Sequence, residues 1–557
     1  MPSLNWIGKD KVINHHLDVP YRVLEHGYGF DNGQETKNEI KSGNKIIHGD
    51  NLEALKSLLP EYEGKIKCIY IDPPYNTGNE HWVYNDNVND SKIKKWLGQV
   101  VGKEFEDLTR HDKWLCMMYP RLKLLHKLLA EDGAIFISIN EDEQASLKLL
   151  LDEIFGPGNY LTMFTIKLRH EERILKGDKD FHEVTEQLFL YRKSHKFKPY
   201  KKQYDNTSIS EYIYEVNILD DTPKIHLMDG KTVKSYSPDQ FEIIKKQPDE
   251  SLLKKINIRG TLKEGNSSGR FYMKHFQPLV SENYGHLFSV PDMGDDGTGN
   301  RFFLLPKNEK KSNGDYFQGI PQKRSDIKEI PYPNYFDFTD DFNRVGYEGG
   351  VDFRFGKKPI DFLKRIFEIA GLQNLPDALI LDSFGGSGST AHAVMQFNND
   401  YKGKRNFLII EMEDYARTIT AERIKIVIRN YTEKENIKNS FDYYELGPQL
   451  FNENNELNEL VEVEKLRQYI YFSETQQNLL ATDLRDNEYF LNKYSDTSYY
   501  FYYDREGLTI LNYDFLSTIK IKSEQYIIYA DKCLLTKEYM NKHKIIFKKI
   551  PRDISRF

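Results

Sequence analysis

Four residues, Asp72-Pro73-Pro74-Tyr75, directly follow the strongly apolar segment 66–71, which is typical of a buried strand. Ligands of open α/β sheets bind just beyond the carboxyl ends of the strands, where this tetrad falls. An amino group on an aromatic base is a poor nucleophile because its lone pair is delocalised into the ring. Two acceptors aligned with its N–H bonds would free that lone pair, and the Asp72 carboxylate and the Pro73 carbonyl are suited to this role because proline restricts the local backbone. Tyr75 offers a ring face on which an extruded base can stack. The alternative is a Pro-Pro turn that ends a strand, with Asp72 and Tyr75 incidental.

A glycine-rich loop follows a second apolar segment and opens a helical pattern. Its residues are Asp382, Ser383, Phe384, Gly385, Gly386, Ser387, Gly388, Ser389 and Thr390. Glycines permit a tight turn and a close approach of the backbone to a ligand. The loop lacks the lysine of a phosphate-binding loop, and its spacing is not that of a dinucleotide fingerprint. It therefore favours a ligand without a pyrophosphate, such as the methionine part of S-adenosylmethionine. Glu411 ends the next apolar segment, and an acidic residue about 20 positions past such a loop commonly accepts hydrogen bonds from ribose hydroxyls. A solvated carboxylate at a strand end is the alternative for Glu411.

The segments around both motifs alternate between apolar runs and helical patterns, which predicts a parallel or mixed sheet with right-handed crossovers. Strands are expected at 45–48, 66–71, 134–139, 379–382 and 406–411. A helix is expected from Leu52 to Leu59, capped by Asn51 and stopped by Pro60. Neither α/β block makes a full sheet alone, so we expect one sheet that the two blocks build jointly.

The chain is expected to divide into five regions. These are an N-terminal arm (1–43), a first core part with the tetrad (44–195), an inserted module of weak periodicity (196–344), a second core part with the glycine loop (345–435) and a C-terminal region (436–557).

Composition sets broad limits. The 557 residues suggest about three or four domains. The net charge of -7 argues mildly against a nucleic-acid partner, although the 78 Lys and Arg residues could still line one cleft. Cys68, Cys116 and Cys533 have no metal-site or disulfide spacing, and no signal peptide or apolar run of about 18 residues occurs. The string 182–186, His-Glu-Val-Thr-Glu, lacks the second His of a zinc motif. We expect a cytoplasmic protein with no metal and no membrane segment.

Taken together, these residues resemble the β class of amino-methyltransferases, and more closely the modification (Mod) subunits of Type III restriction–modification systems. In that family the tetrad precedes the cofactor loop and the target-recognition region lies between them, which is the order found here. Further segments that resemble the family are His48-Gly49-Asp50-Asn51, Asp112 to Leu122, Asp132 to Ile139, Phe355-Gly356-Lys357-Lys358-Pro359 and Ile546 to Ile554. Residues 200–340 match least.

The resemblance implies a circularly permuted, Rossmann-like methyltransferase sheet with an inserted target-recognition domain and a C-terminal α/β extension. It implies that S-adenosylmethionine is the cofactor, with Asp50 near its adenine and Lys358-Pro359 against it. It also implies double-stranded DNA as substrate, a homodimer, and a separate restriction subunit with helicase and nuclease functions. The methyl group would pass in line to the 6-amino nitrogen of a flipped adenine.

Three alternatives stay open. Asp72 as the first tetrad residue favours adenine by resemblance, whereas Ser is commoner in enzymes that methylate the 4-amino group of cytosine. RNA and protein amide methyltransferases usually carry Asn there. A non-catalytic scaffold that only recognises DNA for a nuclease partner is the third. DNA recognition is expected within 196–344, where Arg259, Arg270, Arg301 and Arg324 are basic candidates, each more readily a phosphate contact or solvated side chain than a base reader.

Overall fold

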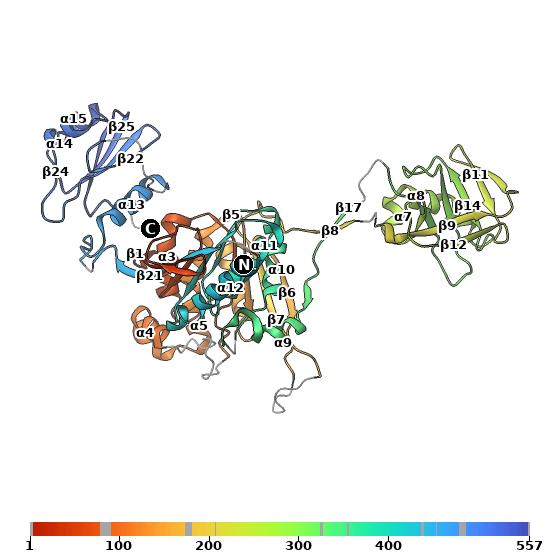
Figure 1. The fold of residues 1–557 in the computed structure, drawn as a ribbon, viewed down its shortest axis with the longest axis horizontal. Helices are drawn as coiled ribbons and strands as arrows, with labels where there is room; N and C mark the ends of the chain where they lie inside the picture. Colours follow the sequence, from red (N-terminus) through yellow and green to blue (C-terminus); the bar gives the residue numbers. More distant parts are fainter. Residues whose placement is uncertain are drawn as a thin grey trace. The chain divides into compact units, whose positions relative to one another are not determined.

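A computed structural model describes residues 4–77, 91–172, 181–205, 208–322, 327–353, 356–435, 439–452, 454–477, 479 and 486–554 (Figure 1). The chain forms two compact units. The first comprises Met1–Tyr200 with Pro333–Phe557, and the second is Lys201–Tyr332.

The first unit is built on an 11-stranded mixed sheet with the order β18-β6-β7-β5-β4-β19-β20-β3-β21-β1-β2. The strands are β1 (Arg22–Asp31), β2 (Gln34–Thr36), β3 (Lys45–His48), β4 (Ile66–Ile71), β5 (Leu129–Ile139), β6 (Tyr160–Lys167), β7 (Thr185–Arg192), β18 (Tyr335–Asp337), β19 (Leu379–Asp382), β20 (Asn406–Glu411) and β21 (Ser440–Gln449). The α/β class is thus confirmed. The sheet takes strands from both expected core blocks, and also from the expected arm (β1, β2), the expected inserted module (β18) and the expected C-terminal region (β21).

The centre of the sheet joins segments that are about three hundred positions apart in the sequence. β19 lies between β4 and β20, and both pairs are parallel. Ile380 is opposite Cys68 and Leu381 is opposite Ile69, so β4 and β19 end at the same edge of the sheet. β20 in turn pairs in parallel with β3. The prediction of one jointly built sheet is therefore confirmed.

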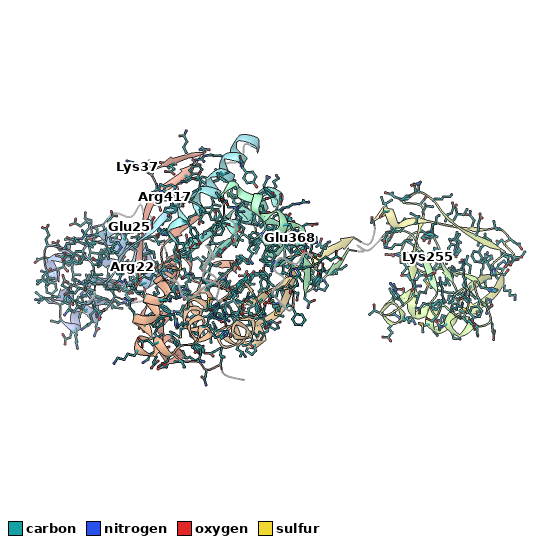
Figure 2. The ribbon with its side chains drawn as sticks, turned by 90° about the horizontal axis from the view of Figure 1, so that it is seen from below. Arg22, Glu25, Lys37, Lys255, Glu368 and Arg417 are labelled. Atoms are coloured by element: carbon teal, nitrogen blue, oxygen red, sulfur yellow. The ribbon has the colours of Figure 1, made fainter. Side chains whose placement is uncertain are left out.

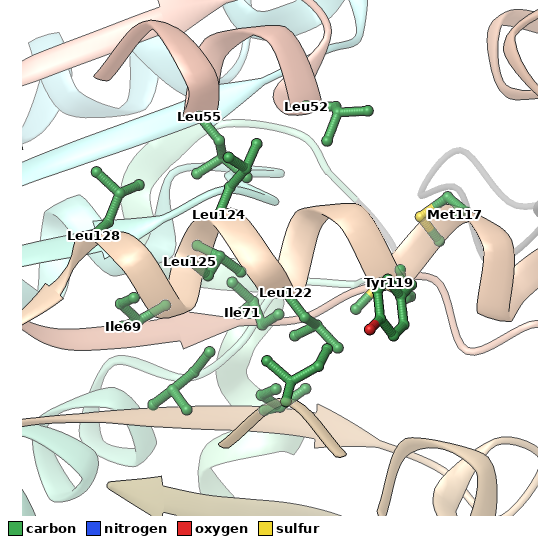
Figure 3. Close-up of a cluster of buried hydrophobic side chains, with 14 of the residues drawn as sticks. Leu52, Leu55, Ile69, Ile71, Met117, Tyr119, Leu122, Leu124, Leu125 and Leu128 are labelled. Carbon is green, nitrogen blue, oxygen red and sulfur yellow. The ribbon is translucent and has the colours of Figure 1, made fainter. Parts of the chain in front are cut away.

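Helices pack on this sheet in the first unit. They are α1 (Lys9–Val12), α2 (His15–Asp18), α3 (Asn51–Tyr62), α4 (Ser91–Val100), α5 (Arg110–Leu128), α6 (Gln144–Phe155), α9 (Thr339–Arg344), α10 (Ile360–Ile369), α11 (Ser389–Tyr401) and α12 (Thr420–Glu435). Leucines of α3 and α5 and isoleucines of β4 form one buried cluster (Figure 3). The N-terminus of α5 is fixed by a capping box between Thr109 and Asp112. No helix within the described ranges is both long enough and apolar enough to span a membrane.

Two expectations about α3 were wrong. The cap is Asp50 rather than Asn51, since the Asp50 carboxylate accepts hydrogen bonds from the backbone N–H groups of Leu52 and Glu53. The helix also continues past Pro60 to Tyr62. Pro60 lies in the last turn, where its missing N–H removes a single backbone hydrogen bond while its fixed φ still suits a helix.

Polar contacts also attach β1 to its neighbours. The Arg22 guanidinium forms an ion pair of 2.7 Å with Glu53 on α3 and donates to the Gly447 carbonyl on β21 at 3.0 Å. Figure 2 labels Arg22 and Glu25 of β1. Arg417 lies 5.4 Å from the ring centroid of Tyr28. The residues before the first core block are therefore part of the sheet structure.

The C-terminal part of the first unit contains a four-stranded sheet, β22-β23-β25-β27, and a two-stranded sheet, β24-β26. The elements are α13 (Val463–Thr475), β22 (Phe490–Tyr494), β23 (Thr497–Phe501), β24 (Ile510–Leu511), α14 (Tyr513–Thr518), β25 (Gln525–Ala530), β26 (Lys532–Cys533), α15 (Lys537–Lys542) and β27 (Ile545–Lys549).

The second unit is mainly β structure, with an eight-stranded sheet in the order β10-β11-β14-β15-β16-β13-β9-β12 and the pair β17-β8. Its elements are β8 (Lys202–Asp205), β9 (Tyr212–Ile218), β10 (Lys224–Met228), β11 (Lys231–Tyr236), β12 (Phe241–Lys245), β13 (Leu253–Asn257), α7 (Leu262–Gly265), α8 (Ser267–Phe271), β14 (Leu287–Pro291), β15 (Asn300–Leu304), β16 (Asp315–Gln318) and β17 (Ile327–Ile330). Aromatic side chains such as Tyr272, Phe276 and Phe303 fill its core. The bounds of the five expected regions stay predictions.

Candidate active site

The tetrad and the glycine loop lie side by side at one edge of the large sheet. Asp72 directly follows β4, and Asp382 ends the neighbouring strand β19. Both carboxylates are buried, with exposed fractions of 6% and 3%. Two acidic side chains therefore face a common region at the carboxyl ends of adjacent parallel strands, where α/β sheets bind ligands.

The tetrad is held by hydrogen bonds on both sides. The Tyr75 hydroxyl donates to Asp72 Oδ1 at 2.7 Å. The indole N–H of Trp114, on α5, donates to the Pro74 carbonyl at 2.7 Å in a fully buried contact. Pro73 and Pro74 are buried as well. The backbone of the tetrad is thus fixed by the helix beneath it as well as by its prolines.

A buried lysine and a second carboxylate complete this side of the site. The Lys358 ammonium lies 2.8 Å from Glu186 Oε1, 2.7 Å from the Tyr75 hydroxyl and 3.3 Å from Asp72 Oδ1. Burial lowers the pKa of Lys358, but the Asp72 and Glu186 carboxylates outweigh that effect and raise it above its ordinary value. Burial and the same two carboxylates raise the pKa of Tyr75 well above its usual range. Lys358 is therefore a cation and Tyr75 a neutral hydroxyl at physiological pH.

The glycine loop depends on its glycines at particular positions. Gly386 and Gly388 have φ values of 50° and 78°, which favour glycine over other residues. A Cβ on Gly385 would lie 2.4 Å from Cγ2 of Ile409 on β20. The Gly385 N–H donates to the Ile410 carbonyl at 2.9 Å, so the loop packs tightly against that strand.

Polar side chains fix the loop from behind. Asp382 accepts hydrogen bonds from the Phe384 N–H at 3.0 Å and from the Thr390 hydroxyl at 2.5 Å. The fully buried Arg423, on α12, donates to the Ser387 hydroxyl at 2.9 Å. Burial raises the pKa of Asp382 to about 8, although its hydrogen bonds act to lower it. Asp382 and Thr390 therefore shape the loop from within.

Glu411 links the end of β20 to the loop. Its carboxylate accepts from the Gly386 N–H at 2.6 Å and from the Glu413 N–H at 2.9 Å. Burial raises the pKa of Glu411 to about 7, against the effect of these backbone bonds. The carboxylate is poised to change charge near neutral pH.

A pocket lies between the two motifs. It encloses about 430 Å³, counting the space at its open mouth, and residues from both sides line it. They include Pro74 from the tetrad, Ser383, Phe384 and Glu411 from the glycine loop and β20, and Asn51 and Arg121 from α3 and α5. The Ser383 hydroxyl is buried at this wall and has no hydrogen-bond partner among the described residues. The pocket thus offers a bound molecule an acidic and a hydroxyl group.

A family model described as DNA methylase, N6_N4_Mtase, matches residues 66–422, which is more than half of the chain and includes both motifs. The chain belongs to this DNA methylase family. The EcoPI Mod subunit of a Type III restriction-modification enzyme, from Escherichia phage P1, is 29% identical over 74% of this methylase and 64% of its own length. The StyLTI Mod subunit of Salmonella typhimurium is 30% identical over 74% of this chain and 58% of its own. The methylase therefore spans less than two thirds of the length of these Mod relatives.

Solved structures of methyltransferases also match this methylase. The PvuII DNA methyltransferase (cytosine-N4-specific) aligns with 68% of the chain and 86% of its own length, at 12% identity and a TM-score of 0.30. The M1.HpyAVI complex with SAM aligns with 68% of the chain and 98% of its own length, at 12% identity and a TM-score of 0.28.

The cofactor residues expected from the sequence fall into three groups. Asp382, Gly385, Gly386, Ser387, Gly388 and Thr390 build the glycine loop but are not among the residues that line the pocket. Ser383, Phe384 and Glu411 line the pocket. Asp50 instead caps α3, and Pro359 is the N-cap residue of α10. The ammonium of Lys358 lies on the tetrad side, with Asp72. Contact of Asp50, Lys358 and Pro359 with a cofactor stays a prediction.

Sequence reasoning missed several residues around the pocket. Asn51 is buried, donates to the Ser383 carbonyl at 3.1 Å and accepts from the Arg121 guanidinium at 2.6 Å, so it joins α3, α5 and the glycine loop. The position of Asn51 beside Asp50, in a segment that resembles the family, could have indicated that Asn51 belongs to the site.

Glu186 was also missed, because in the sequence it is only the last residue of a string that lacks the second His of a zinc motif. A single glutamate on a strand gives no signal of its partner on a distant segment.

Basic residues of the second unit differ in their environments. Arg301 is 1% exposed and forms an ion pair of 3.0 Å with Asp296. Arg259 and Arg270 are exposed, and Arg270 donates to the Glu264 carbonyl at 3.2 Å. Arg324, like Phe355 of the Lys-Pro segment, lies outside the described residues. Burial therefore removes Arg301 from the candidates for DNA contact.

Proposed function

We propose that this chain transfers a methyl group from S-adenosylmethionine to the 6-amino group of adenine in double-stranded DNA. The observation that carries the proposal is the shared pocket, which is lined both by Pro74 of the tetrad and by Ser383, Phe384 and Glu411. Family membership and the similarity to Mod subunits support the reaction class.

The pocket residues fit the proposed cofactor. The Glu411 carboxylate suits ribose hydroxyl donors, and the unpaired Ser383 hydroxyl offers a further polar contact. Phe384, Met412 and Tyr415 line the same pocket and supply apolar surface suited to an adenine ring. When bound, S-adenosylmethionine supplies an electrophilic methyl group on a sulfonium. We propose Asp382, Gly385, Gly386, Ser387, Gly388 and Thr390 as the residues that hold the backbone of this loop in its binding form.

The tetrad prepares the amine in this proposal. The Asp72 carboxylate and the Pro73 carbonyl accept hydrogen bonds from its two N–H groups, which draws the nitrogen toward tetrahedral geometry. Positive charge develops on the nitrogen during transfer, and Asp72 stabilises it more in the transition state than in the ground state. Tyr75 provides the ring against which the extruded base lies. Most of the rate enhancement comes from holding the two reactants in line.

We further propose that the chain is the modification and specificity subunit of a Type III restriction–modification system in the cytoplasm. The second unit is then the target-recognition domain, and Arg259 and Arg270 remain its candidates for DNA contact. A homodimer and a separate helicase–nuclease restriction subunit belong to the same proposal. The support is the Mod relatives and the family's order of tetrad, inserted module and cofactor loop.

The test is methyl transfer by the purified chain from tritiated S-adenosylmethionine to unmethylated double-stranded DNA of mixed sequence that has been amplified in vitro. We expect the label in 6-methyladenine after digestion to nucleosides. Label in 4-methylcytosine would contradict the choice of base. Absence of label, with the protein folded and DNA bound, would favour the non-catalytic scaffold and end the proposal.

A further inference from the structure

Three distant segments bring four polar side chains together beside the tetrad. Asp72 and Tyr75 follow β4, Glu186 is the second residue of β7, and Lys358 precedes α10. β7 runs antiparallel to β5, with Gln187 opposite Ile139, so the start of β7 lies at the edge where the parallel strands end. This topology explains why a glutamate from the beginning of one strand meets an aspartate from the end of another.

The cluster holds two carboxylates and one ammonium. The side chains of Asp72, Glu186 and Lys358 are 8%, 5% and 8% exposed. Buried charges are costly unless they are paired, so the single cation serves both anions. The Lys358 ammonium lies closer to Glu186 than to Asp72, because its Nζ atom is 2.8 and 2.9 Å from the two oxygens of Glu186 and 3.3 Å from Asp72 Oδ1.

We propose that Glu186 is a positioning residue for methyl transfer, which holds the Lys358 ammonium on its own side so that the field of the Asp72 carboxylate is less compensated at the amine. The inference rests on the proposed function, since it concerns the carboxylate that receives the amine. Glu186 Oε2 also lies 3.0 Å from the Tyr75 hydroxyl, whose one proton can go to Glu186 or to Asp72, so Glu186 helps to hold the ring on which the base stacks.

The physical consequence concerns the transition state. A carboxylate paired closely with an ammonium stabilises a developing positive charge less than one that is not, because the two fields oppose each other. Without the charge of Glu186, Lys358 has one anion left to pair with, and that anion is Asp72. Replacing Glu186 should therefore slow the chemical step and leave both binding steps largely intact.

The first experiment compares Glu186→Gln with the wild-type protein. We expect kcat to fall on the order of tenfold to a hundredfold, less than the loss of a direct transition-state contact. The dissociation constants for S-adenosylmethionine and for DNA should change less than threefold. Glu186→Asp, which restores the charge, should recover most of kcat. A kcat of Glu186→Gln within twofold of wild type, or a loss confined to cofactor affinity, would overturn the proposal.

A double variant separates positioning from a merely structural role. In Glu186→Gln with Lys358→Met, the cation that neutralises Asp72 is gone, so at alkaline pH the double variant should turn over faster than Glu186→Gln alone. A purely structural role predicts equal turnover of the two variants per folded molecule, because Lys358→Met then acts only on stability. The folded fraction of each variant is measured by circular dichroism, and the rates are compared per folded molecule.

Glu474 offers a matched control. It is a glutamate on α13 whose side chain is 8% exposed and which accepts from the Lys548 ammonium and from the Tyr529 hydroxyl, the same partner types as Glu186. Glu474→Gln should alter thermal stability and leave kcat unchanged. If wild type transfers methyl groups but Glu186→Gln equals Glu474→Gln in kcat, only this inference fails. If wild type transfers none, the proposed function fails with it.

Discussion

Replacement of Glu411 by Gln tests the cofactor side of the pocket. The carboxylate has two backbone donors, at 2.6 Å from Gly386 and 2.9 Å from Glu413, and it lines the pocket. Gln keeps the shape but loses the charge that two ribose hydroxyls would meet. Hydrogen bonds to charged groups contribute about 1.5–3 kcal/mol, so affinity for S-adenosylmethionine should fall by about 10- to 150-fold.

Isothermal titration calorimetry measures this loss directly. Asp72→Asn is the matched control, because it makes the same kind of change on the tetrad side. We expect that variant to bind S-adenosylmethionine within threefold of wild type and to transfer no methyl group. Binding by Glu411→Gln within threefold of wild type would refute the assignment of Glu411 to the ribose.

Three further predictions follow from burial and close packing. Burial raises the pKa of Glu411 to about 7, so Glu411 stabilises the unliganded fold at low pH and loses that effect as the pH rises through 7. The affinity for the cofactor should increase over the same pH range. A flat affinity profile in calorimetry between about pH 5.5 and 8.5 would contradict this prediction. Gly385→Ala places a Cβ 2.4 Å from a side-chain methyl on β20 and should lower the free energy of unfolding by about 1–3 kcal/mol in chemical denaturation. Gly158→Ala, whose Cβ would have nothing within 4 Å, should lower it far less. Equal effects would show that the loop is not tightly packed. Arg301→Met should destabilise the second unit by about 3–5 kcal/mol because it leaves the buried Asp296 carboxylate without its cation. Arg259→Ala should leave the melting of the second unit unchanged. An unaltered melting curve for Arg301→Met would refute the buried ion pair.

The fold could be predicted furthest where apolar strands run directly into functional loops. The strands at 66–71, 379–382 and 406–411 have the predicted bounds. Their nearly continuous apolar residues reflect burial on both faces, which leaves little ambiguity. The errors in α3 arose where Asp50 and Asn51 are both good caps and where a proline in a last turn costs little.

Only the parts of the site that are formed by contiguous sequence motifs could be predicted. The tetrad and the glycine loop are contiguous motifs, so their residue types could be interpreted before their positions were known. Glu186, Asn51 and Lys358 depend on contacts between segments that are far apart in sequence. Their roles follow from strand order and burial, which no local pattern of residue types encodes.

The central claim is that a methyl donor binds in the pocket between Pro74 and Ser383, next to Asp72. A crystal structure of the chain with S-adenosylmethionine tests it most directly. We expect Glu411 to contact the ribose and the sulfonium methyl to face the Asp72 carboxylate. A cofactor bound in another cleft, with this pocket empty, would contradict it.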